Sequence, residues 1–468
     1  MHALLHHLKK AIPQRSPLRL AWHHARAFAA ALRFGFPARS LTVIGITGTD
    51  GKTTTVGMVA HILEHTGIAA GALSTAFLQV RDHMEWNTTQ KTSPSPFLIQ
   101  GFLRRLVREG CTHAVIEASS HGLVQGRLHF TRPLIAAVTN VSPEHLDYHE
   151  TMEQYRRDKG ILFRMLRKGG VKVLNAADES FSLYEAIPTE QTVLWAGTEE
   201  EVRRGQRGKG GQGGKRGLTL LWFSDVYVTA NGSSAVLHAE IQERANEPTL
   251  LRSHGATEGQ ASQRANVSLA IPGSFNLENA LAAVGCAMSL GIPMSTCAEA
   301  LATFRGVAGR MERISEGQPF SVFVDFTVTP AAYEKTLTAL RAMLPAGRRL
   351  LVLTGSCGDR MREKRPLVGA ICSRLADVVV ITNEDPYTED PETIIEEVWA
   401  GIDQSKTEAC KIFDRREAIR FLFSKAEPGD IVVLCAKGAD TTMMTAEGQI
   451  PWNEREIARE ILRKMKAT

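Results

Sequence analysis

The stretch TVIGITGTDGKTTTVGMVAHILEHTG, residues 42–67, decides the fold class of this chain. Its apolar start, LTVIGITG at 41–48, predicts a buried strand, and KTTTVGMVAHILEHTG at 52–67 predicts a helix that ends at Gly67. A glycine turn between a strand and a helix is the context of phosphate-binding loops, although Ile46 stands where the usual spacing asks for the first glycine. The stretch therefore raises the question of which nucleotide chemistry the loop serves.

The loop offers the groups that a bound nucleotide needs. Gly48 and Gly51 let backbone N–H groups approach an anion, and the positive end of the following helix points to the same place. Lys52 would lie between the β- and γ-phosphates, and Thr53 would present its hydroxyl to Mg²⁺. We prefer this interpretation to a glycine turn without a ligand, because Lys-Thr-Thr-Thr falls at the start of the helix. The predicted nucleotide contacts in the loop are Gly48, Thr49, Asp50, Gly51, Lys52, Thr53 and Thr54.

Strands and helices alternate on both sides of a boundary near residues 304–314. Before it, a helix is predicted at 97–110, followed by strands at 111–120 and 133–142. After it, four strands are predicted, with helices between them, at 320–326, 349–358, 377–385 and 430–438. This alternation predicts an α/β fold. The expected parts are a short basic segment (1–40), a central P-loop ATPase domain with a mostly parallel sheet (41–308) and a C-terminal Rossmann-like α/β domain (309–468).

Composition limits the class of protein. The chain has 468 residues, of which 43% are hydrophobic and 22% charged, as in globular proteins, and its net charge of +5 gives no reason to expect nucleic-acid binding. Its seven cysteines show no C-x-x-C pair, which argues against a zinc site or a disulfide framework and fits a reducing cytoplasm. No apolar run reaches the roughly 20 residues that a membrane-spanning helix needs. We therefore expect no transmembrane segment, and we expect a monomer.

Two segments carry much of the positive charge. Residues 1–49 contain no acidic residue, and LAWHHARAFAAALRFGF at 20–36 predicts an amphipathic basic helix. We favour packing of this helix against the following domain over attachment to a membrane surface. RRGQRGKGGQGGKRG at 203–217 predicts a mobile loop, and RNA binding there is disfavoured because no aromatic residue could stack on a base.

Later residues narrow the nucleotide chemistry. No N-K-x-D motif for reading guanine is present. Glu117 ends a predicted strand of the same sheet, where a carboxylate could hold Mg²⁺, although a buried structural Glu is the alternative. His145 and Lys159 are further candidates for a metal site, provided that the lysine reacts with CO₂ to form a carbamate, since an ammonium group cannot bind Mg²⁺. Taken alone, Lys159 would be a solvated helix lysine.

Seven motifs, in this order, resemble those of the Mur ligases, and among these the UDP-N-acetylmuramoyl-tripeptide synthetases, which add the third residue of the peptidoglycan stem peptide. They are GITGTDGKTTT, IEASSHGLVQGR (116–127), TNVSPEHLDYH (139–149), DKGILF (158–163), GSFNLENALAA (273–283), GRMERI (309–314) and DRMREKRP (359–366). The resemblance covers about residues 41–460. It implies an ADP-forming acid–amino-acid ligase that uses ATP and two Mg²⁺ ions, with a UDP-muramoyl-peptide-like acceptor and an amino acid as the other substrates.

The resemblance also implies roles for individual residues. Lys52 and Thr53 correspond to the contacts with the ATP phosphates and Mg²⁺, Glu117 and His145 to metal ligands, and Lys159 to the family's carbamylated lysine. The remaining nucleotide contacts would be Asn276, Asn279, Arg310 and Asp325. The acceptor would be held by Thr92, Ser93, Ser119, Gln125 and Arg127.

The sequence departs from the family's pattern in several places. About 40 residues precede the loop, where the family usually has a whole domain that binds uridine diphosphate. DNPR, whose Arg reads the distal carboxylate of diaminopimelate, appears as Glu384-Asp385-Pro386-Tyr387, and the Glu of GKGHE appears as Asp440. DYAHTP appears as DFTVTP at 325–330, and Asp50 replaces the usual Asn. Since Tyr387 carries no positive charge, meso-diaminopimelate is disfavoured as the substrate and L-lysine is our hypothesis.

Two other functions stay open at this point. A ligase of the same superfamily could act on another acceptor, as folylpolyglutamate- or cyanophycin-type enzymes do. A nucleotide-binding regulator without catalysis is the second alternative, and the presence of Lys52, Glu117, His145 and Lys159 argues against it.

Overall fold

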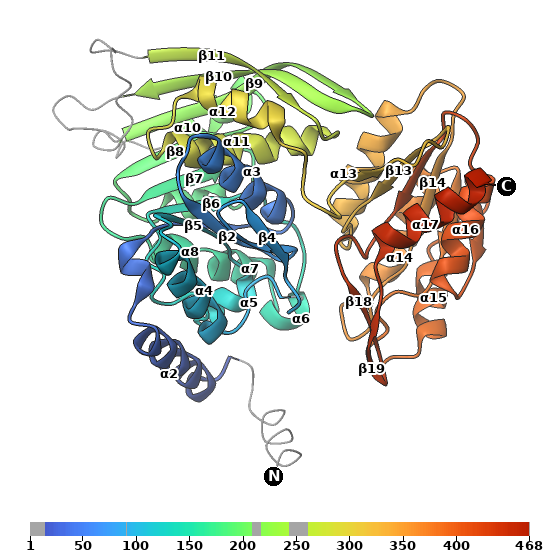
Figure 1. Cartoon of the computed structure of the whole chain (residues 1–468), viewed down its shortest axis with the longest axis horizontal. Helices are drawn as coiled ribbons and strands as arrows, with labels where there is room; N and C mark the ends of the chain where they lie inside the picture. The colour runs from blue at the N-terminus through green and yellow to red at the C-terminus, as the bar shows by residue number, and fades with distance from the viewer. Residues whose placement is uncertain (1–14, 90, 208–216, 243–260, 468) are drawn as a thin grey trace.

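A computed structural model describes residues 15–89, 91–207, 217–242 and 261–467. The chain forms two parts, each built on its own sheet, which lie side by side in Figure 1. The earlier part, drawn from blue to yellow, carries the loop at 48–51, and the later part, drawn from orange to red, follows residue 309. The predicted α/β class, with a large and mostly parallel first sheet and a second sheet domain, is confirmed.

The first sheet has eleven strands, and its central strands from β9 to β2 pair in parallel. The hairpins at its two ends are antiparallel. In sheet order the strands are β11 (Ala261–Leu269), β10 (Gly232–Gln242), β9 (Gly217–Thr229), β8 (Gln191–Trp195), β7 (Val171–Asn175), β6 (Ile135–Val138), β1 (Thr42–Thr47), β5 (His113–Glu117), β2 (Ala70–Leu73), β3 (Phe77–Val80) and β4 (His83–Trp86).

Both faces of the sheet are buried at its central strands, whose successive side chains point to opposite faces and pack under helices on either side. In β1, Ile44 and Ile46 pack into one apolar cluster and Val43 into another. The first cluster lies under α3 (Lys52–His65), α11 (Ser274–Met288) and α12 (Met294–Thr303). Helices that contribute to the other face are α4 (Pro96–Arg108), α5 (Ser120–Val124), α7 (Met152–Lys159), α8 (Ile161–Arg164), α9 (Phe181–Glu185) and α10 (Glu199–Arg207), and the short α6 (Leu146–His149) precedes α7.

The second sheet has six strands, of which all but β12 run parallel. In sheet order they are β12 (Glu312–Ile314), β13 (Ser321–Val324), β17 (Ile431–Leu434), β14 (Leu350–Thr354), β15 (Val378–Ile381) and β16 (Glu408–Lys411). Its helices are α13 (Pro330–Met343), α14 (Lys364–Leu375), α15 (Pro391–Trp399), α16 (Arg415–Lys425) and α17 (Glu454–Ala467), and β18 (Thr442–Thr445) and β19 (Gly448–Pro451) form a separate hairpin.

The structure corrects two sequence predictions. Four strands were predicted for the second sheet, but β12 and β16 extend it to six. Both are short edge strands, and β16 has exposed charged residues at its two ends, so neither forms a recognisable apolar run. The predicted loop at 203–217 begins as helix, because α10 continues to Arg207. Ion pairs Arg203–Glu199 and Arg204–Glu200 and the buried Val202 stabilise that turn. Residues 208–216 lie outside the described residues.

The predicted basic amphipathic helix is present as α2 (Pro17–Arg33), followed by the 3₁₀ turn η1 (Pro37–Ser40). Ala27, Ala30 and Ala31 are fully buried, and the helix packs on α4. The packing that we favoured is therefore found for one face of α2. Among the described residues, no helix is both long and apolar enough to cross a membrane.

Candidate active site

One pocket of about 350 Å³ lies between the two sheets and collects most of the predicted site residues. Its walls come from loops at the carboxyl ends of the parallel strands of both sheets, where ligands of open α/β sheets bind. The predicted residues that line it are Gly48, Thr49, Asp50, Gly51, Lys52, Thr53, Thr54, Thr92, Glu117, Ser119, His145, Lys159, Asn276, Asn279, Arg310, Asp325, Glu384, Asp385, Tyr387 and Asp440.

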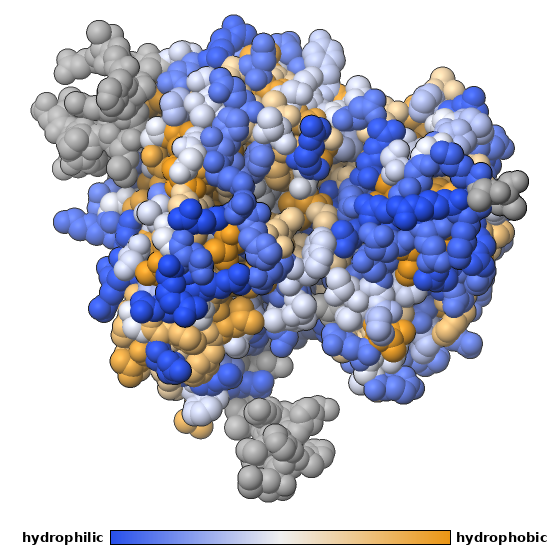
Figure 2. All heavy atoms as spheres, in the orientation of Figure 1, coloured by the Kyte–Doolittle hydropathy of each residue, from blue (hydrophilic) through white to orange (hydrophobic). Residues whose placement is uncertain are grey.

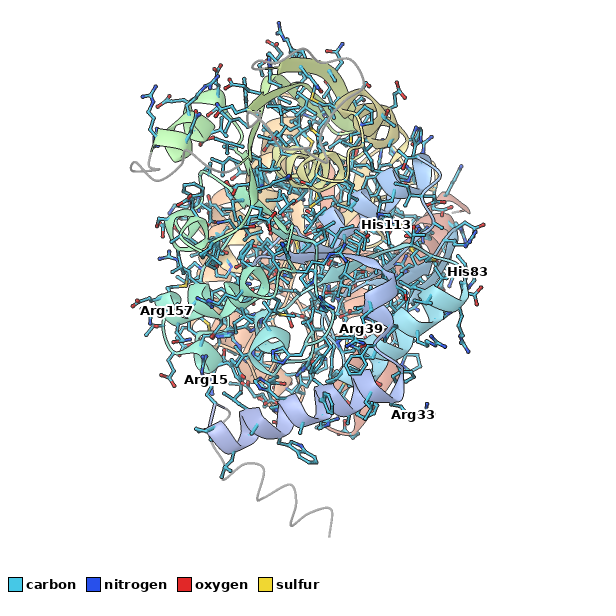
Figure 3. The ribbon with its side chains drawn as sticks, turned by 90° about the vertical axis from the view of Figure 1, so that its left-hand side faces the viewer. Arg15, Arg33, Arg39, His83, His113 and Arg157 are labelled. Atoms are coloured by element: carbon cyan, nitrogen blue, oxygen red, sulfur yellow. The ribbon has the colours of Figure 1, made fainter. Side chains whose placement is uncertain are left out.

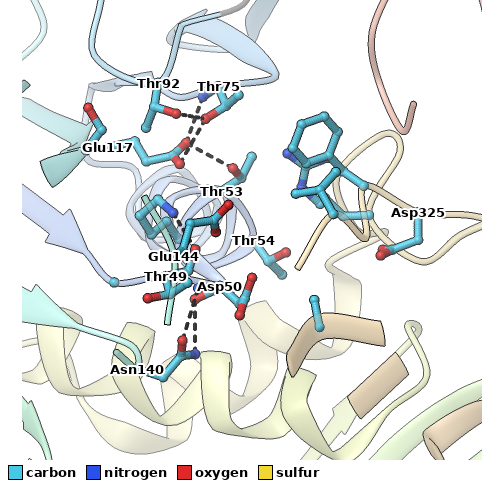
Figure 4. A pocket seen from close by; sticks show the side chains of 18 of the residues that line it. Thr49, Asp50, Thr53, Thr54, Thr75, Thr92, Glu117, Asn140, Glu144 and Asp325 are labelled. Atoms are coloured by element: carbon cyan, nitrogen blue, oxygen red, sulfur yellow. Dashed lines mark hydrogen bonds between the residues drawn. The ribbon is translucent and has the colours of Figure 1, made fainter. Parts of the chain in front are cut away.

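Glu117 is held in the pocket by two hydroxyl groups and one backbone N–H. Thr53 Oγ1 donates a hydrogen bond of 3.0 Å to Glu117 Oε2, and the backbone N–H of Thr75 donates one of 2.7 Å to the same oxygen. Thr75 Oγ1 lies 2.9 Å from Glu117 Oε1 and 2.8 Å from Thr92 Oγ1 (Figure 4). The carboxylate is 1% exposed and keeps its orientation through these three donors. Thr75 was not predicted, and no motif in the sequence pointed to it.

The glycines of the loop are required by close contacts. Gly48 (φ +148°) and Gly51 (φ +81°) have left-handed backbones, and a Cβ on them would lie 1.9 Å from Thr139 Oγ1 and 2.1 Å from Asn279 Oδ1. Asn140 Oδ1 accepts a hydrogen bond of 3.0 Å from the backbone N–H of Asp50 (Figure 4). The loop is thus held in place by the residues that follow β6 and by α11.

Lys159 is fully buried and points at the loop. Its Nζ donates a hydrogen bond of 2.6 Å to the carbonyl of Gly48 and lies 4.4 Å from the centre of the Tyr155 ring. Burial, aided by the nearby charge of Lys52, lowers the pKa of this ammonium group well below its ordinary value. The side chain is therefore not the solvated helix lysine that the sequence alone suggested. A neutral amine is the form that reacts with CO₂.

The loop after β6 places His145 and Glu144 in the same pocket. Burial, and then the neighbouring His121, lower the pKa of His145 to about 2, so its imidazole is neutral and can offer a lone pair. The rings of His121 and His145 lie 4.7 Å apart. Burial raises the pKa of Glu144 to about 7. Glu144 was not singled out from the sequence, although it directly precedes His145.

A chain of contacts leads from the segment before α2 to the residue next to Lys159. Arg15 donates two hydrogen bonds to Asp158, of 2.6 and 2.9 Å, and His149 Nδ1 lies 2.6 Å from the same carboxylate. His149 Nε2 lies 2.9 Å from Ser120 Oγ. These residues fix the end of α7 that carries Lys159. Arg15 and Asp158 are 143 positions apart, so no local pattern could have joined them.

The second sheet contributes charged groups from the opposite side of the pocket. Met311 N–H donates a hydrogen bond of 2.7 Å to Asp325, which also accepts one from Thr327. The Arg310 guanidinium lies 4.4 Å from the Phe326 ring centre. Figure 4 shows Asp325 facing the phosphate loop from across the pocket. Burial lowers the pKa of Arg310 and raises that of Asp325.

Acidic residues gather where the family's DNPR and GKGHE motifs would stand. Lys437 Nζ lies 2.8 Å from Asp385 Oδ1 and 3.3 Å from Asp440 Oδ2. Burial and the neighbouring Asp385 raise the pKa of Glu384 to about 7. Tyr387 adopts a left-handed backbone (φ +52°), and the guanidinium of Arg360, which also lines the pocket, lies 5.0 Å from its ring centre.

Four predicted residues do not line the pocket: Ser93, Gln125, Arg127 and Pro386. Ser93 Oγ accepts a hydrogen bond of 2.9 Å from the backbone N–H of Ser119 and donates one of 3.2 Å to the carbonyl of Glu117. Arg127 donates to Ser93 O at 2.6 Å and to Gln125 Oε1. The first three thus lie directly behind the strand end that carries Glu117 and Ser119.

The donor atoms suit Mg²⁺ bound together with phosphates. Thr53 and Glu117 supply a hydroxyl and a carboxylate, which are hard oxygen ligands. Within the described ranges, no group of three or more His, Cys, Asp and Glu residues is placed to hold a metal ion. Thr53 and Glu117 are the residues that would hold a Mg²⁺ ion here, and the ion would supply positive charge next to bound phosphates.

Comparison with known proteins identifies two family domains in this chain. The Mur ligase middle domain matches residues 46–287, and the Mur ligase, glutamate ligase domain matches residues 309–438. UDP-N-acetylmuramyl-tripeptide synthetase of Roseiflexus sp. (strain RS-1) is 36% identical over 451 residues, which is 94% of this chain and 82% of that protein.

Two solved structures show the same fold. One, a UDP-N-acetylmuramoyl-L-alanyl-D-glutamate–2,6-diaminopimelate ligase, is 27% identical with a TM-score of 0.56, covering 92% of this chain and 79% of the other. MurF ligase from Thermotoga maritima in complex with ADP is 16% identical with a TM-score of 0.60, covering 95% and 85%. The resemblance found in the seven motifs is confirmed, and this chain belongs to the Mur ligase family.

Proposed function

We propose that this chain is an ATP-dependent amide ligase that adds an amino acid to a UDP-N-acetylmuramoyl-dipeptide-like acceptor in peptidoglycan precursor synthesis. The observation that carries the proposal is the shared pocket: the phosphate loop with Lys52, Thr53 and Glu117 on one side, and Arg310 and Asp325 of the second sheet on the other. Its relatives in the family are named as ligases of muramoyl peptides.

The chemistry follows from charge. In the first step an acceptor carboxylate oxygen bonds to the γ-phosphorus of ATP and the bond to ADP breaks, which leaves an acyl phosphate. Two anions must approach each other, so Lys52 and the N-terminal end of α3 would lower the repulsion. Mg²⁺, held by Thr53 and Glu117, would supply further positive charge. In the second step the amine nitrogen bonds to the acyl carbon, phosphate leaves and a proton is released, which gives the amide.

Lys159 is proposed to carry a carbamate. Its neutral amine would bond to CO₂ and release a proton, and the new carboxylate would lie beside Gly48, at the phosphate loop. A neutral His145 lines the same pocket and would be a ligand of the second Mg²⁺ ion. The support for both roles is their burial at the loop and the family's pattern.

The proposed contacts with each substrate follow from the part of the pocket that each residue lines. Thr92 and Ser119 line the wall next to Glu117 and would contact the acceptor, with Ser93, Gln125 and Arg127 supporting them from behind. Asn276 and Asn279 of α11, next to Gly51, would contact the nucleotide. The amino acid would enter beside Glu384, Asp385, Tyr387 and Asp440. Tyr387 offers no positive charge there for a distal carboxylate, which supports lysine over diaminopimelate.

The proposal is tested by measuring phosphate release from ATP with a panel of acceptors and amino acids. Release should require a UDP-muramoyl-dipeptide, an amino acid and Mg²⁺ together, and Lys52→Ala should remove it. If no UDP-muramoyl-dipeptide supports phosphate release, but a polyglutamate or an aspartate-polymer acceptor does, the folylpolyglutamate- or cyanophycin-type alternative would be the better assignment. A reducing cytoplasm is part of the proposal, supported by seven free thiols. A monomeric state is proposed as well.

A further inference from the structure

The outward face of α2 is apolar along its whole length. Leu18, Trp22, Phe28 and Leu32 are 80%, 63%, 49% and 62% exposed, although each is a large apolar side chain. The small residues between them on the same face are exposed as well, and the complete apolar stripe consists of Leu18, Ala21, Trp22, Ala25, Phe28, Ala29 and Leu32. Figure 2 shows apolar atoms gathered at the lower left of the molecule, where Figure 1 places α2.

The apolar stripe continues onto neighbouring aromatic residues. The ring of Phe28 lies 6.2 Å from that of Phe36 and 5.8 Å from that of Phe130, and Phe36 and Phe130 are also 5.8 Å apart. Phe97, at the start of α4, is 39% exposed. Isolated exposed apolar residues are ordinary, but a continuous set marks a surface that contacts something else.

Only positive charge borders the apolar stripe within its own segment. Residues 15–49 contain no Asp or Glu. Arg33 and Arg39 are exposed, and their guanidinium groups lie 5.6 and 4.6 Å from the ring centres of Phe34 and Phe36. Figure 3 shows this helix along one edge of the molecule, with Arg15 near its start and Arg33 and Arg39 near its end.

We propose that α2 is a docking surface for an anionic lipid bilayer. A helix that combines a Trp, Phe and Leu face with flanking arginines is suited to lie in the plane of a membrane, its apolar side among the acyl chains and its arginines at the head groups. The buried alanine face stays on α4, so the domain itself would be held at the surface. The active-site pocket plays no part in this contact.

A second copy of this chain is a less suitable partner. The apolar stripe itself runs from residue 18 to residue 32, which is about 21 Å of helix, and at a helix width of about 10 Å it offers about 200 Å². Phe36 and Phe130 beside it are only partly exposed and add little to this area. Stable protein interfaces need about 800 Å² from each partner. Two arginine-bordered stripes facing each other would also place like charges together.

The test measures flotation of the full chain with vesicles of phosphatidylcholine alone or mixed with phosphatidylglycerol. We expect binding to the mixed vesicles only, weakened by added salt. Leu32→Asp should lower the bound fraction at least about tenfold. Leu367→Asp, at a leucine that is 55% exposed on α14 of the other part, should bind as the unchanged protein does. Circular dichroism verifies that both variants fold.

Trp22 provides a second measurement. Its fluorescence should shift to shorter wavelength on mixed vesicles, and Trp22→Phe should lose that shift while still binding. Absence of binding to mixed vesicles would overturn the proposal. So would sedimentation that shows a dimer sensitive to Leu32→Asp without vesicle binding, because the occupant would then be a second copy. Vesicle binding that appears only after removal of residues 1–14 would show instead that this segment covers the apolar stripe.

Discussion

The two sides of the pocket are built on different principles. On the side of the first sheet, Glu117 is oriented by neutral donors from Thr53 and Thr75, and a glycine loop is wedged between β6 and α11. On the side of the second sheet, Asp385 and Asp440 share the charge of Lys437. Phosphoryl transfer needs a fixed geometry, so the residues that set this geometry tolerate little substitution. Recognition of an amino acid depends instead on which charged side chains are present. The departures at Tyr387 and Asp440 fall on the second side, and the smaller one at Asp50 falls on the first.

Removal of the Lys159 side chain should have the largest effect on activity, and it tests the side of the pocket formed by the first sheet. Lys159→Ala should lower phosphate release by about 10³-fold, because the pocket loses both the buried amine and its proposed carbamate. Added bicarbonate should restore nothing, and short carboxylates should restore part of the rate. Lys168→Ala, at an exposed lysine just beyond α8, should be neutral. Full activity of Lys159→Ala without added carboxylates would rule out the carbamate.

Glu117→Gln is expected to have the next largest effect. The amide keeps the size of the side chain but removes the negative charge that would hold Mg²⁺, so turnover should fall about a hundredfold and need more Mg²⁺. Rates measured over a series of Mg²⁺ concentrations check this. The matched control is Glu153→Gln, whose carboxylate is exposed and paired with Arg157. If the rate of Glu117→Gln depends on Mg²⁺ as that of the unchanged protein does, Glu117 has a purely structural role.

The second side of the pocket should respond in selectivity more than in rate. Tyr387→Arg introduces a charge that can pair with a carboxylate, so the ratio of activity with diaminopimelate to activity with lysine should rise about tenfold. Tyr387→Phe keeps the ring under Arg360 and should leave the ratio unchanged. If the unchanged protein already prefers diaminopimelate, the argument from Tyr387 is wrong, and Arg360 becomes the candidate for reading the carboxylate.

The smallest effect concerns the contact between Arg15 and Asp158. Burial would raise the pKa of Asp158, but hydrogen bonds from His149 and Arg15 outweigh it and lower the pKa to about 2. A depressed folded-state pKa stabilises the fold above about pH 4, and this contribution is lost as the pH falls toward 2.

Arg15→Ala should therefore lower the midpoint temperature of the first unfolding transition by about 2–4 °C at neutral pH. This shift corresponds to a loss of about 1 kcal/mol in the free energy of unfolding. The difference from the unchanged protein should shrink in acid. Scanning calorimetry at several pH values measures it, with Arg157→Ala as the exposed control. A deficit that is the same at every pH would show that the contact acts through packing and not through charge.

Local patterns predicted the parts of the site that lie in one stretch of chain. The strand, glycine turn and helix at 42–67 appear as β1, the loop and α3, and Glu117 ends β5 as its apolar run indicated. The edge strands β12 and β16 were missed, because they have too few buried side chains to leave a pattern. The buried strands β2, β7 and β8 were not predicted either, since each spans only four or five residues. The importance of Lys159 came from the family's motif, since a lysine on a helix has no local sign of burial.

The sequence by itself determined the alternation of strands and helices, the phosphate loop and the family, because backbone preference and apolar periodicity act over neighbouring residues. Only the tertiary structure decided which polar groups face one another: Lys159 against the carbonyl of Gly48, Arg15 against Asp158, and Asp325 across from the loop. It also decided that the alanine face of α2 is buried and its leucine and tryptophan face exposed. Burial and electrostatics depend on residues far apart in the chain, and they set the pKa values on which the proposed chemistry relies.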